Sequence, residues 1–221
     1  MLEMDKRHIS NYVLTYLRKK ILLQELKEGS HLKEFELSKR LSVSRGPIRE
    51  AISKLEAEGL VITPANGRSV VQKFGEADIK HLYESRILLE TYALSKHDPE
   101  LLAKDGPLLY EYINQMEQSL TGTSENVDLD LQFHYLLVQM TGNKTLIRLW
   151  SSMNEVIKML IEVTTEFTAT RKQEIYLQHK VIVDAIKKGD TEEAQRLLRI
   201  HLEGASDYYS KAVFKLQGEE E

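Results

Sequence analysis

The chain has 221 residues, of which 42% are hydrophobic and 29% are charged, and it contains no cysteine. This composition is typical of a globular protein of one or two domains. The missing thiol excludes a disulfide scaffold, a thiolate zinc site, an iron–sulfur cluster and a cysteine nucleophile. No stretch reaches the roughly 18 apolar residues of a membrane span, and residues 1–20 lack the apolar segment of a signal peptide. We therefore expect a cytoplasmic protein without a membrane partner.

Charge is divided unevenly along the chain. Residues 1–75 carry 14 Lys and Arg against 9 Asp and Glu, whereas residues 76–221 carry 16 against 25. Such asymmetry suggests a basic module for a polyanion joined to an acidic module with another task. We therefore place a domain boundary between residues 75 and 76.

Three helices are predicted in the basic segment. Apolar residues recur at three- and four-residue spacing over 8–26, where Gly29 is the expected stop, and a short second helix covers 34–41. Ser44 stands at an N-cap position, and a third helix follows it to Glu58.

Two short β-rich runs come next, at 60–63 and 68–71, and they flank the dipeptide Asn66-Gly67. Asn-Gly between such runs is the strongest short-range signal for a β-hairpin. Three helices followed by a hairpin describe a winged helix-turn-helix.

The third helix carries the residues expected to contact DNA bases. In a helix-turn-helix, the N-terminal residues of this helix meet base edges in the major groove. Arg45 and Arg49 lie one turn apart and so share a face, and an arginine fork pairs bidentately with guanine. Ser44 and the exposed N–H groups of the helix start suit a phosphate. An ordinary surface charge is the alternative for any single arginine, but the grouping favours DNA.

The hairpin and the second helix supply further candidates. Arg68, beside Gly67, is placed to bring the wing to the minor groove or to the DNA backbone. Lys39, Arg40 and Lys54 are expected to contact phosphates or solvent.

The winged helix of the GntR family closely resembles two segments of this chain, LSKRLSVSRGPIREA at 37–51 and LEAEGLV at 55–61. The resemblance implies that Arg45 and Arg49 contact operator bases and that the wing assists. One position departs from the family, because some members carry a DNA-contacting arginine where this chain has Phe35.

Residues 76–221 are predicted to be all helical, in a bundle long enough to bury its own core. No strand pattern follows the connector at 72–75, and Pro99 and Pro107 are expected at a helix start or in a loop. The predicted helices span 76–97, 99–120, 126–141, 143–168, 171–189 and 191–216.

Four residues of this bundle have the spacing of a metal site. Asp130 and His134 are four apart and so share a helical face. His179 and His201 stand at nearly equal distances from the turn at 189–190, and in an antiparallel hairpin such residues lie side by side, about 16 Å from the turn. Three imidazoles and a carboxylate suit a divalent transition metal. From the spacing alone, packed or solvated histidines and an ordinary i,i+4 pair explain the pattern equally well.

The same residues lie in segments that resemble the FCD effector domain of the FadR subfamily. Its usual forms are D-x-x-F-H, S-G-N, E-H-x-x-I-x-x-A-I-x-x-G-D and H-L, and they match the chain from Asp130 onward, with Gln178 where a glutamate is common. The resemblance implies that Asp130, His134, His179 and His201 bind a metal. The donor set itself suits zinc, nickel, cobalt, manganese or iron, and zinc is the first candidate.

The resemblance also implies a small carboxylate effector that reaches the metal. Arg86, in a segment that looks like R-x-x-L-E, is the candidate for a second carboxylate contact, with a helix pair to Glu90 as the alternative. Asn143 is a candidate pocket residue, with a helix cap as the alternative. The remaining histidines have no partner pattern and are interpreted as surface or packing residues: His8, His31, His81 and His97.

These expectations favour a mainly α protein with a winged helix-turn-helix at 1–75 and an FCD-type effector domain at 76–221. We expect a regulator, not an enzyme, that binds a pseudo-palindromic DNA operator as a homodimer and responds to a small organic acid. One alternative is a helical metalloenzyme acting on a small carboxylate. No carboxylate pair or nucleophile with a base is in register with the ligands, and Glu90 and Glu174 are the remaining candidates for a general base. Another alternative is a structural zinc that only holds the bundle together.

Overall fold

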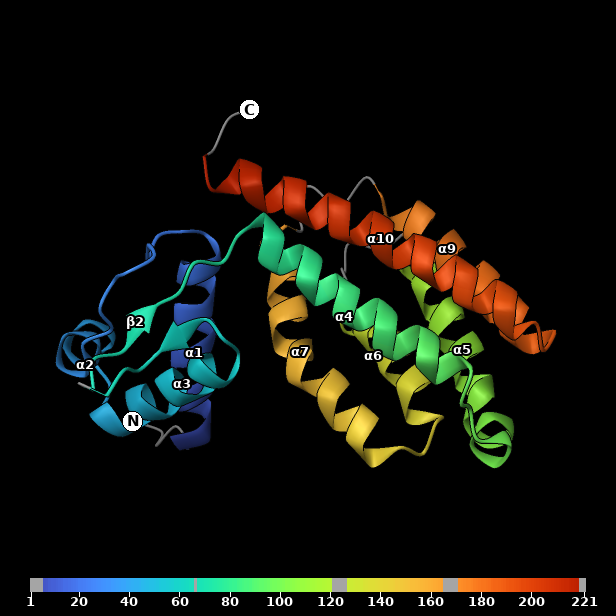
Figure 1. Ribbon diagram of the computed structural model, residues 1–221, viewed down its shortest axis with the longest axis horizontal. Coiled ribbons are helices and arrows are strands. Elements are labelled where there is room, and N and C mark those ends of the chain that lie inside the picture. The colour runs from blue at the N-terminus through green and yellow to red at the C-terminus, as the bar shows by residue number, and fades with distance from the viewer. Residues whose placement is uncertain (1–5, 66, 121–126, 165–170, 219–221) are drawn as a thin grey trace. The chain divides into compact units, whose positions relative to one another are not determined.

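The computed structural model describes residues 6–65, 67–120, 127–164 and 171–218 (Figure 1). Within these ranges the chain is mainly α, with nine helices and one two-stranded sheet, as predicted. It divides into two compact units, Met1–Ala77 with Val213–Glu221, and Asp78–Ala212. No helix in the described ranges is long and apolar enough to cross a membrane.

The first unit contains the three helices predicted for a winged helix-turn-helix: α1 (Lys6–Leu22), α2 (Glu34–Leu41) and α3 (Arg45–Ala57). A left-handed Ser42 ends α2, and its N–H donates to the carbonyls of the last turn. The short turn between α2 and α3 brings the start of α3 to the surface, since Ser44 and Arg45 are both exposed.

The hairpin consists of β1 (Val61–Ile62) and β2 (Val70–Val71), which pair antiparallel with Val61 opposite Val71. Gly67 adopts a φ of 72°, and its N–H donates to the Pro64 carbonyl at 2.8 Å, whereas Asn66 lies outside the described residues. The strands are shorter than predicted. Residues 29–32, which have no strand pattern in the sequence, also hydrogen-bond to the β2 segment.

Helix α1 ends at Leu22 and not at residue 26, as the sequence had suggested. The physical reason is Gln24, which adopts a left-handed φ of 57° and so stops the helical hydrogen bonding before Gly29. The Leu22 carbonyl instead accepts a hydrogen bond of 2.8 Å from the side-chain amide of Gln217.

The core of the first unit joins α1, α3 and the hairpin. Its fully buried members include Val13, Leu17, Ile48, Leu55 and Val71. One charged pair is buried beside them. Arg18 donates to both carboxylate oxygens of Glu58, from Nε at 2.9 Å and from Nη2 at 2.6 Å. This bidentate pair ties α1 to the end of α3.

The second unit is a helical bundle, as predicted. Its helices are α4 (Glu76–Leu94) from Asp78 onward, α5 (Pro99–Ser119), α6 (Val127–Gln139), α7 (Lys144–Val163), α9 (Lys172–Lys187) and α10 (Thr191–Leu216) as far as Ala212. Helix α6 packs against α5 and α7, and α5 packs against α9. Trp150 of α7 is buried in one core cluster with Ala93 of α4 and Val138 of α6. Helix α6 is therefore central, and it carries two of the predicted metal ligands.

Most helices of the bundle begin and end close to the predicted residues, and the position of one proline is a correction. Pro107 does not lie at a helix start or in a loop but inside α5. Its side chain is exposed, so solvent can reach the turn that lacks its hydrogen bond. Pro99 stands in the first turn of α5, as predicted, behind an Asp98 cap. The predicted helix start at 126 and the predicted helix end at 168 lie outside the described residues.

Candidate metal centre and DNA surface

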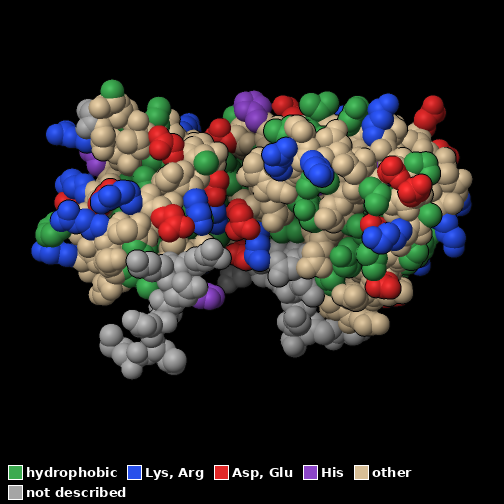
Figure 2. Space-filling model, turned by 90° about the horizontal axis from the view of Figure 1, so that it is seen from below, with side chains coloured by type: hydrophobic (Ala, Val, Ile, Leu, Met, Phe, Trp, Pro, Cys, Tyr) green, Lys and Arg blue, Asp and Glu red, His purple; other side chains and the backbone are tan. Residues whose placement is uncertain are grey.

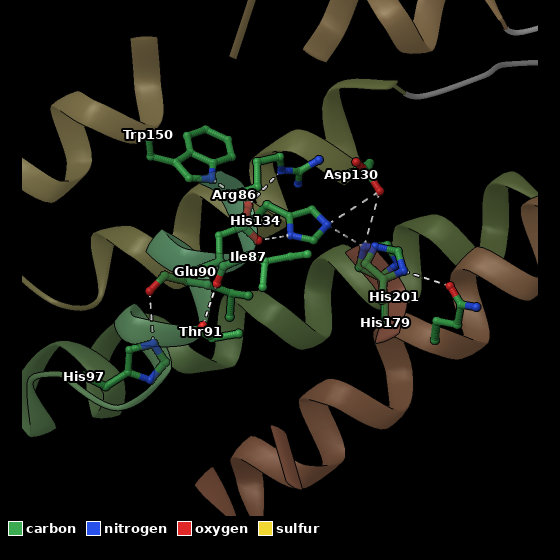
Figure 3. A network of polar contacts seen from close by, with 12 residues as sticks. Arg86, Ile87, Glu90, Thr91, His97, Asp130, His134, Trp150, His179 and His201 are labelled. Atoms are coloured by element: carbon green, nitrogen blue, oxygen red, sulfur yellow. Dashed lines mark hydrogen bonds and ion pairs between the residues drawn. The ribbon is translucent and has the colours of Figure 1, made fainter. Parts of the chain in front are cut away.

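Three helices bring the four predicted metal ligands together (Figure 3). Asp130 and His134 come from α6, His179 from α9 and His201 from α10, and one ligand atom from each lies within 4.8 Å of every other. The rings of His179 and His201 lie side by side, with centroids 4.4 Å apart. The equal spacing of these two residues from the turn at 189–190 predicted this contact. Their role as ligands stays a prediction.

Each of the three imidazole rings is oriented by a hydrogen bond at its Nδ1 atom. His134 Nδ1 lies 2.6 Å from Glu90 Oε2, His179 Nδ1 lies 2.8 Å from the Ile175 carbonyl, and His201 Nδ1 lies 2.8 Å from Gln178 Oε1. Each partner is an oxygen that accepts, so each Nδ1 carries the proton and donates it. The Nε2 atoms are then left as lone pairs, which is the form a metal requires.

The distances among the ligand atoms of Asp130, His134 and His179 fit a small divalent cation, and the His201 ligand atom lies within 4.8 Å of all three. His179 Nε2 lies 3.2 Å from His134 Nε2 and 3.3 Å from Asp130 Oδ1, and His134 Nε2 lies 3.9 Å from the same oxygen. Bonds of about 2.0–2.1 Å from a tetrahedral metal place neighbouring ligand atoms about 3.3 Å apart. The donor set and its spacing therefore suit zinc or a related transition metal.

The charge state of the cluster also suits a metal. Burial lowers the pKa of His134, although Glu90 opposes this, and burial together with the neighbouring imidazoles holds the pKa of His201 well below its usual range. Burial alone would raise the pKa of Asp130, but the side chains around it, His179, His134 and Arg86, lower it. The site therefore combines neutral imidazoles at His134 and His201 with an ionised carboxylate.

A buried carboxylate joins this cluster to the rest of the bundle. Glu90 of α4 is fully buried, and its Oε1 accepts from Arg86 Nε at 2.9 Å and from Trp150 Nε1 at 2.7 Å. Burial would raise the pKa of Glu90, but Arg86 and His134 lower it to about 2. Glu90 is thus an anion that orients His134 through its second oxygen.

A small cavity opens beside the cluster. Its lining includes Asp130 and His201, together with Tyr83, Arg86, Arg171, Gln178 and Tyr209. Arg86 forms the predicted helix pair with Glu90, yet its buried Nη2 has no hydrogen-bond partner within the described part of the chain. A guanidinium nitrogen that is buried without a partner beside a cavity is suited to bind an oxygen of a ligand.

Arg171 adds a second cation to the cavity. Its guanidinium carbon lies 4.4 Å from the centre of the Tyr208 ring, and its Nε pairs with Glu174 Oε2 at 3.1 Å. Asn143, by contrast, does not line this cavity. Its side chain caps α7 by accepting from the N–H groups of the first turn at 3.0 and 3.1 Å.

The predicted DNA-contacting residues lie on the surface of the first unit. Ser44 is the N-cap residue of α3 but makes no side-chain capping hydrogen bond. Arg45 and Arg49 are exposed at the start of the same helix. Arg49 Nε pairs with Glu34 Oε1 at 3.1 Å, and the Arg45 guanidinium lies 5.3 Å from the centre of the Phe35 ring. Both arginines therefore contact the first two residues of α2.

The other DNA candidates are also exposed: Arg40 on α2, and Gly67 and Arg68 in the hairpin. Figure 2 shows Lys and Arg side chains gathered at the left edge, the side on which α2 lies in Figure 1, with hydrophobic atoms among them. Such a surface suits a polyanion.

Around the candidate metal centre, sequence reasoning paired Glu90 only with Arg86 and missed Tyr209 and Arg171. Tyr83 and Glu90 lie three residues before and four residues after Arg86, and Tyr209 lies eight residues after His201, so helical periodicity could have placed them on the same faces. No pattern in the sequence marked Arg171.

Two family models match the chain. The model described as bacterial regulatory proteins, gntR family, matches residues 9–71, and the FCD domain model matches residues 81–204.

Curated relatives are similar over most of the chain. The HTH-type transcriptional regulator YdhC of Bacillus subtilis is 28% identical over 84% of this chain and 84% of its own length. The gluconate operon transcriptional repressor of the same species is 28% identical over 79% of this chain and 74% of its own length. The repressor NanR of Escherichia coli K12 is 26% identical over 91% of this chain and 84% of its own length.

Solved structures share the fold. The structure of Lar, which controls the agr system of Listeria monocytogenes, has a TM-score of 0.67 and 20% identity, covering 98% of this chain and 99% of its own. A structure described as a metal-free FCD domain has a TM-score of 0.56 and 21% identity, covering 64% of this chain and 98% of its own. At these identities the likeness shows the fold alone.

Proposed function

This chain belongs to the GntR family of bacterial regulatory proteins and carries an FCD domain, and we propose that a small carboxylate bound at a metal centre controls its affinity for DNA. The family makes it a transcriptional regulator with a helix-turn-helix, and not an enzyme. Regulators of this family bind DNA operators and small-molecule effectors.

The orientation of the three imidazoles carries the metal part of the proposal. Every Nδ1 donates to an oxygen, so all three Nε2 lone pairs are available beside the Asp130 carboxylate. Asp130, His134, His179 and His201 would hold one divalent transition metal, with zinc the first candidate. Such a cation supplies a positive charge that attracts a carboxylate oxygen.

The cavity supports a carboxylate as the effector. Arg86 presents its unpartnered Nη2 and Arg171 adds a second cation, so an anion would be bound by protein side chains as well as by the metal. The lining also contains the phenol groups of Tyr83 and Tyr209, which can hydrogen-bond to ligand oxygens. Among the relatives, the gluconate operon transcriptional repressor carries in its name gluconate, which is a small carboxylate.

DNA binding is assigned to the first unit. Arg45 and Arg49 would contact bases in the major groove, while Ser44, Arg40 and the wing residues Gly67 and Arg68 would contact the backbone or the minor groove. A homodimer would place two such units on a pseudo-palindromic operator. Effector binding must then favour one arrangement of the dimer, with a coupling free energy of about 1–3 kcal/mol.

The first experiment measures metal content by elemental analysis of the untagged protein. It is followed by thermal shifts with a panel of small carboxylates before and after chelation. We expect close to one metal per chain and stabilisation by a carboxylate only in the metal-loaded protein. Protein without metal, or carboxylate binding that survives chelation, would contradict the proposed site. If carboxylate binding survives chelation, the metal has only a structural role.

Substitutions separate the metal site from the DNA surface. The double variant His134→Ala/His201→Ala should lose stoichiometric metal and keep effector-free operator binding, whereas His81→Ala, an exposed histidine on α4, should retain both. Arg45→Ala or Arg49→Ala should weaken operator binding by about 1–3 kcal/mol and relax the preference at one base. Operator binding equal to wild type in either arginine variant would refute the placement of α3.

A further inference from the structure

An exposed aromatic side chain borders the start of α3. Phe35, the second residue of α2, keeps 51% of its surface exposed. Lys39 Nζ lies 4.4 Å from its ring centroid, and the Arg45 guanidinium lies 5.3 Å from it. An apolar ring held against two cations lies on a surface that is otherwise suited to phosphates, where a polar or basic residue would be expected.

The contact with Phe35 restricts Arg45 before any DNA is bound. A cation over an aromatic face is attracted to the ring, so the guanidinium has fewer orientations available than a free surface arginine. Glu34 acts on Arg49 in the same way, through the 3.1 Å pair to its Nε. The first two residues of α2 therefore orient the two arginines that we assign to base contacts.

The exposed part of the Phe35 ring is available for contact with DNA. A phenyl group can neither donate to a phosphate nor accept from a base edge, so polar readout is excluded. The apolar group available in the major groove is the C5-methyl of thymine, and phenylalanine is among the side chains that contact it. Because Phe35 touches Arg45, the two side chains would reach neighbouring base pairs.

We propose that Phe35 is a specificity-determining residue of the DNA interface: it orients Arg45 and packs on a thymine methyl group beside the base that Arg45 contacts. This rests on the proposed function, in which the start of α3 enters the major groove. The structural observation is the contact of an exposed ring with the first residue of that helix.

The test begins with in vitro selection from a randomised duplex library, using the full-length wild-type protein. Affinity for the selected duplex is then compared with that for duplexes in which one thymine is replaced by deoxyuridine, which removes only the methyl group. We expect about a fourfold loss at one position in each half-site, since a buried methyl-sized group contributes about 0.8 kcal/mol.

Variants of Phe35 assign that loss to the ring. Phe35→Ala should bind the thymine and deoxyuridine duplexes equally, whereas Phe35→Leu keeps an apolar side chain and should keep part of the difference. Tyr12→Ala removes an aromatic of similar exposure from the same unit and should behave as wild type. Thermal melting checks that each variant is folded.

The outcomes distinguish this inference from the proposed function. Phe35→Ala with the wild-type base preferences and the wild-type sensitivity to deoxyuridine would overturn the inference, as would a selected operator with no thymine that responds to the substitution. If Arg45→Ala also leaves the preferences unchanged, then the assignment of α3 to the major groove fails as well. Altered preferences in Arg45→Ala alone would leave the proposed function standing and reject only the role of Phe35.

Discussion

Replacing Glu90 by glutamine is expected to weaken metal binding and to destabilise the second unit. The wild-type carboxylate is fully buried, accepts from Arg86 and Trp150, and lies 2.6 Å from His134 Nδ1. Glutamine keeps the volume but carries no charge. The Arg86 guanidinium, whose side chain is only 2% exposed, then loses its ion pair, and His134 loses a charged acceptor.

The two effects have different sizes. Loss of a carboxylate that orients a ligand histidine lowers metal affinity by about 10–100-fold. Loss of one partner of a buried ion pair costs about 3–5 kcal/mol of unfolding free energy. In a protein of this size, 1 kcal/mol shifts Tm by roughly 2–4 °C, so metal-free Glu90→Gln should melt several degrees or more below metal-free wild type.

Competition with a chromophoric chelator, at a temperature well below both transitions, measures the metal affinity. Circular dichroism melting of the metal-free proteins measures the stability. Glu193→Gln is the matched control, because Glu193 pairs with Arg196 at 2.6 Å on the exposed surface of α10 and should change neither quantity. A Glu90→Gln protein that melts lower but binds metal as wild type does would refute the orienting role. Unchanged melting would refute the argument from the buried pair.

The remaining predictions test other contacts. Gln178→Leu removes the oxygen that accepts from His201 Nδ1 and should lower metal affinity by about tenfold in the same chelator assay, with the fold intact by circular dichroism. Burial lowers the pKa of His97, although a backbone hydrogen bond opposes this. In the unfolded protein His97 therefore binds a proton that it does not bind in the folded protein. The protein should lose stability as the pH falls below about 6.5. In His97→Gln the unfolding free energy, measured by denaturant titration at several pH values, should fall less steeply as the pH is lowered. A pH dependence equal to that of wild type would contradict the role given to His97. Glu58→Gln leaves buried Arg18 without its carboxylate and should cost about 3–5 kcal/mol, so a melting curve equal to wild type would show that the pair is dispensable.

Local patterns predicted most of the fold because each helix or turn is specified by nearby residues. The second helix was placed at 34–41 and is observed as Glu34–Leu41, since its apolar spacing and its ends are both local. The exceptions are also informative. Gln24 ends α1 in a conformation that nothing in its side chain requires, and Pro107 is accommodated inside α5 on an exposed face.

The geometry around the candidate site was only partly predictable. Symmetry about the turn at 189–190 was enough to place His179 beside His201. The contacts of Glu90 could not be predicted in this way, because they join it to His134 and Trp150, which are 44 and 60 residues away in the sequence. Such long-range polar contacts depend on how helices pack, and a single sequence carries no direct signal for them.

The place of Trp150 has a practical consequence. It is the only tryptophan in the chain, and its indole N–H donates to the carboxylate that orients His134. Any change in charge at the cluster alters the electric field at this one fluorophore, whose emission depends on its hydrogen bonding and surroundings. The protein therefore contains an intrinsic optical reporter, two hydrogen bonds from the predicted ligand His134, and titrations of metal or effector can be followed without a label.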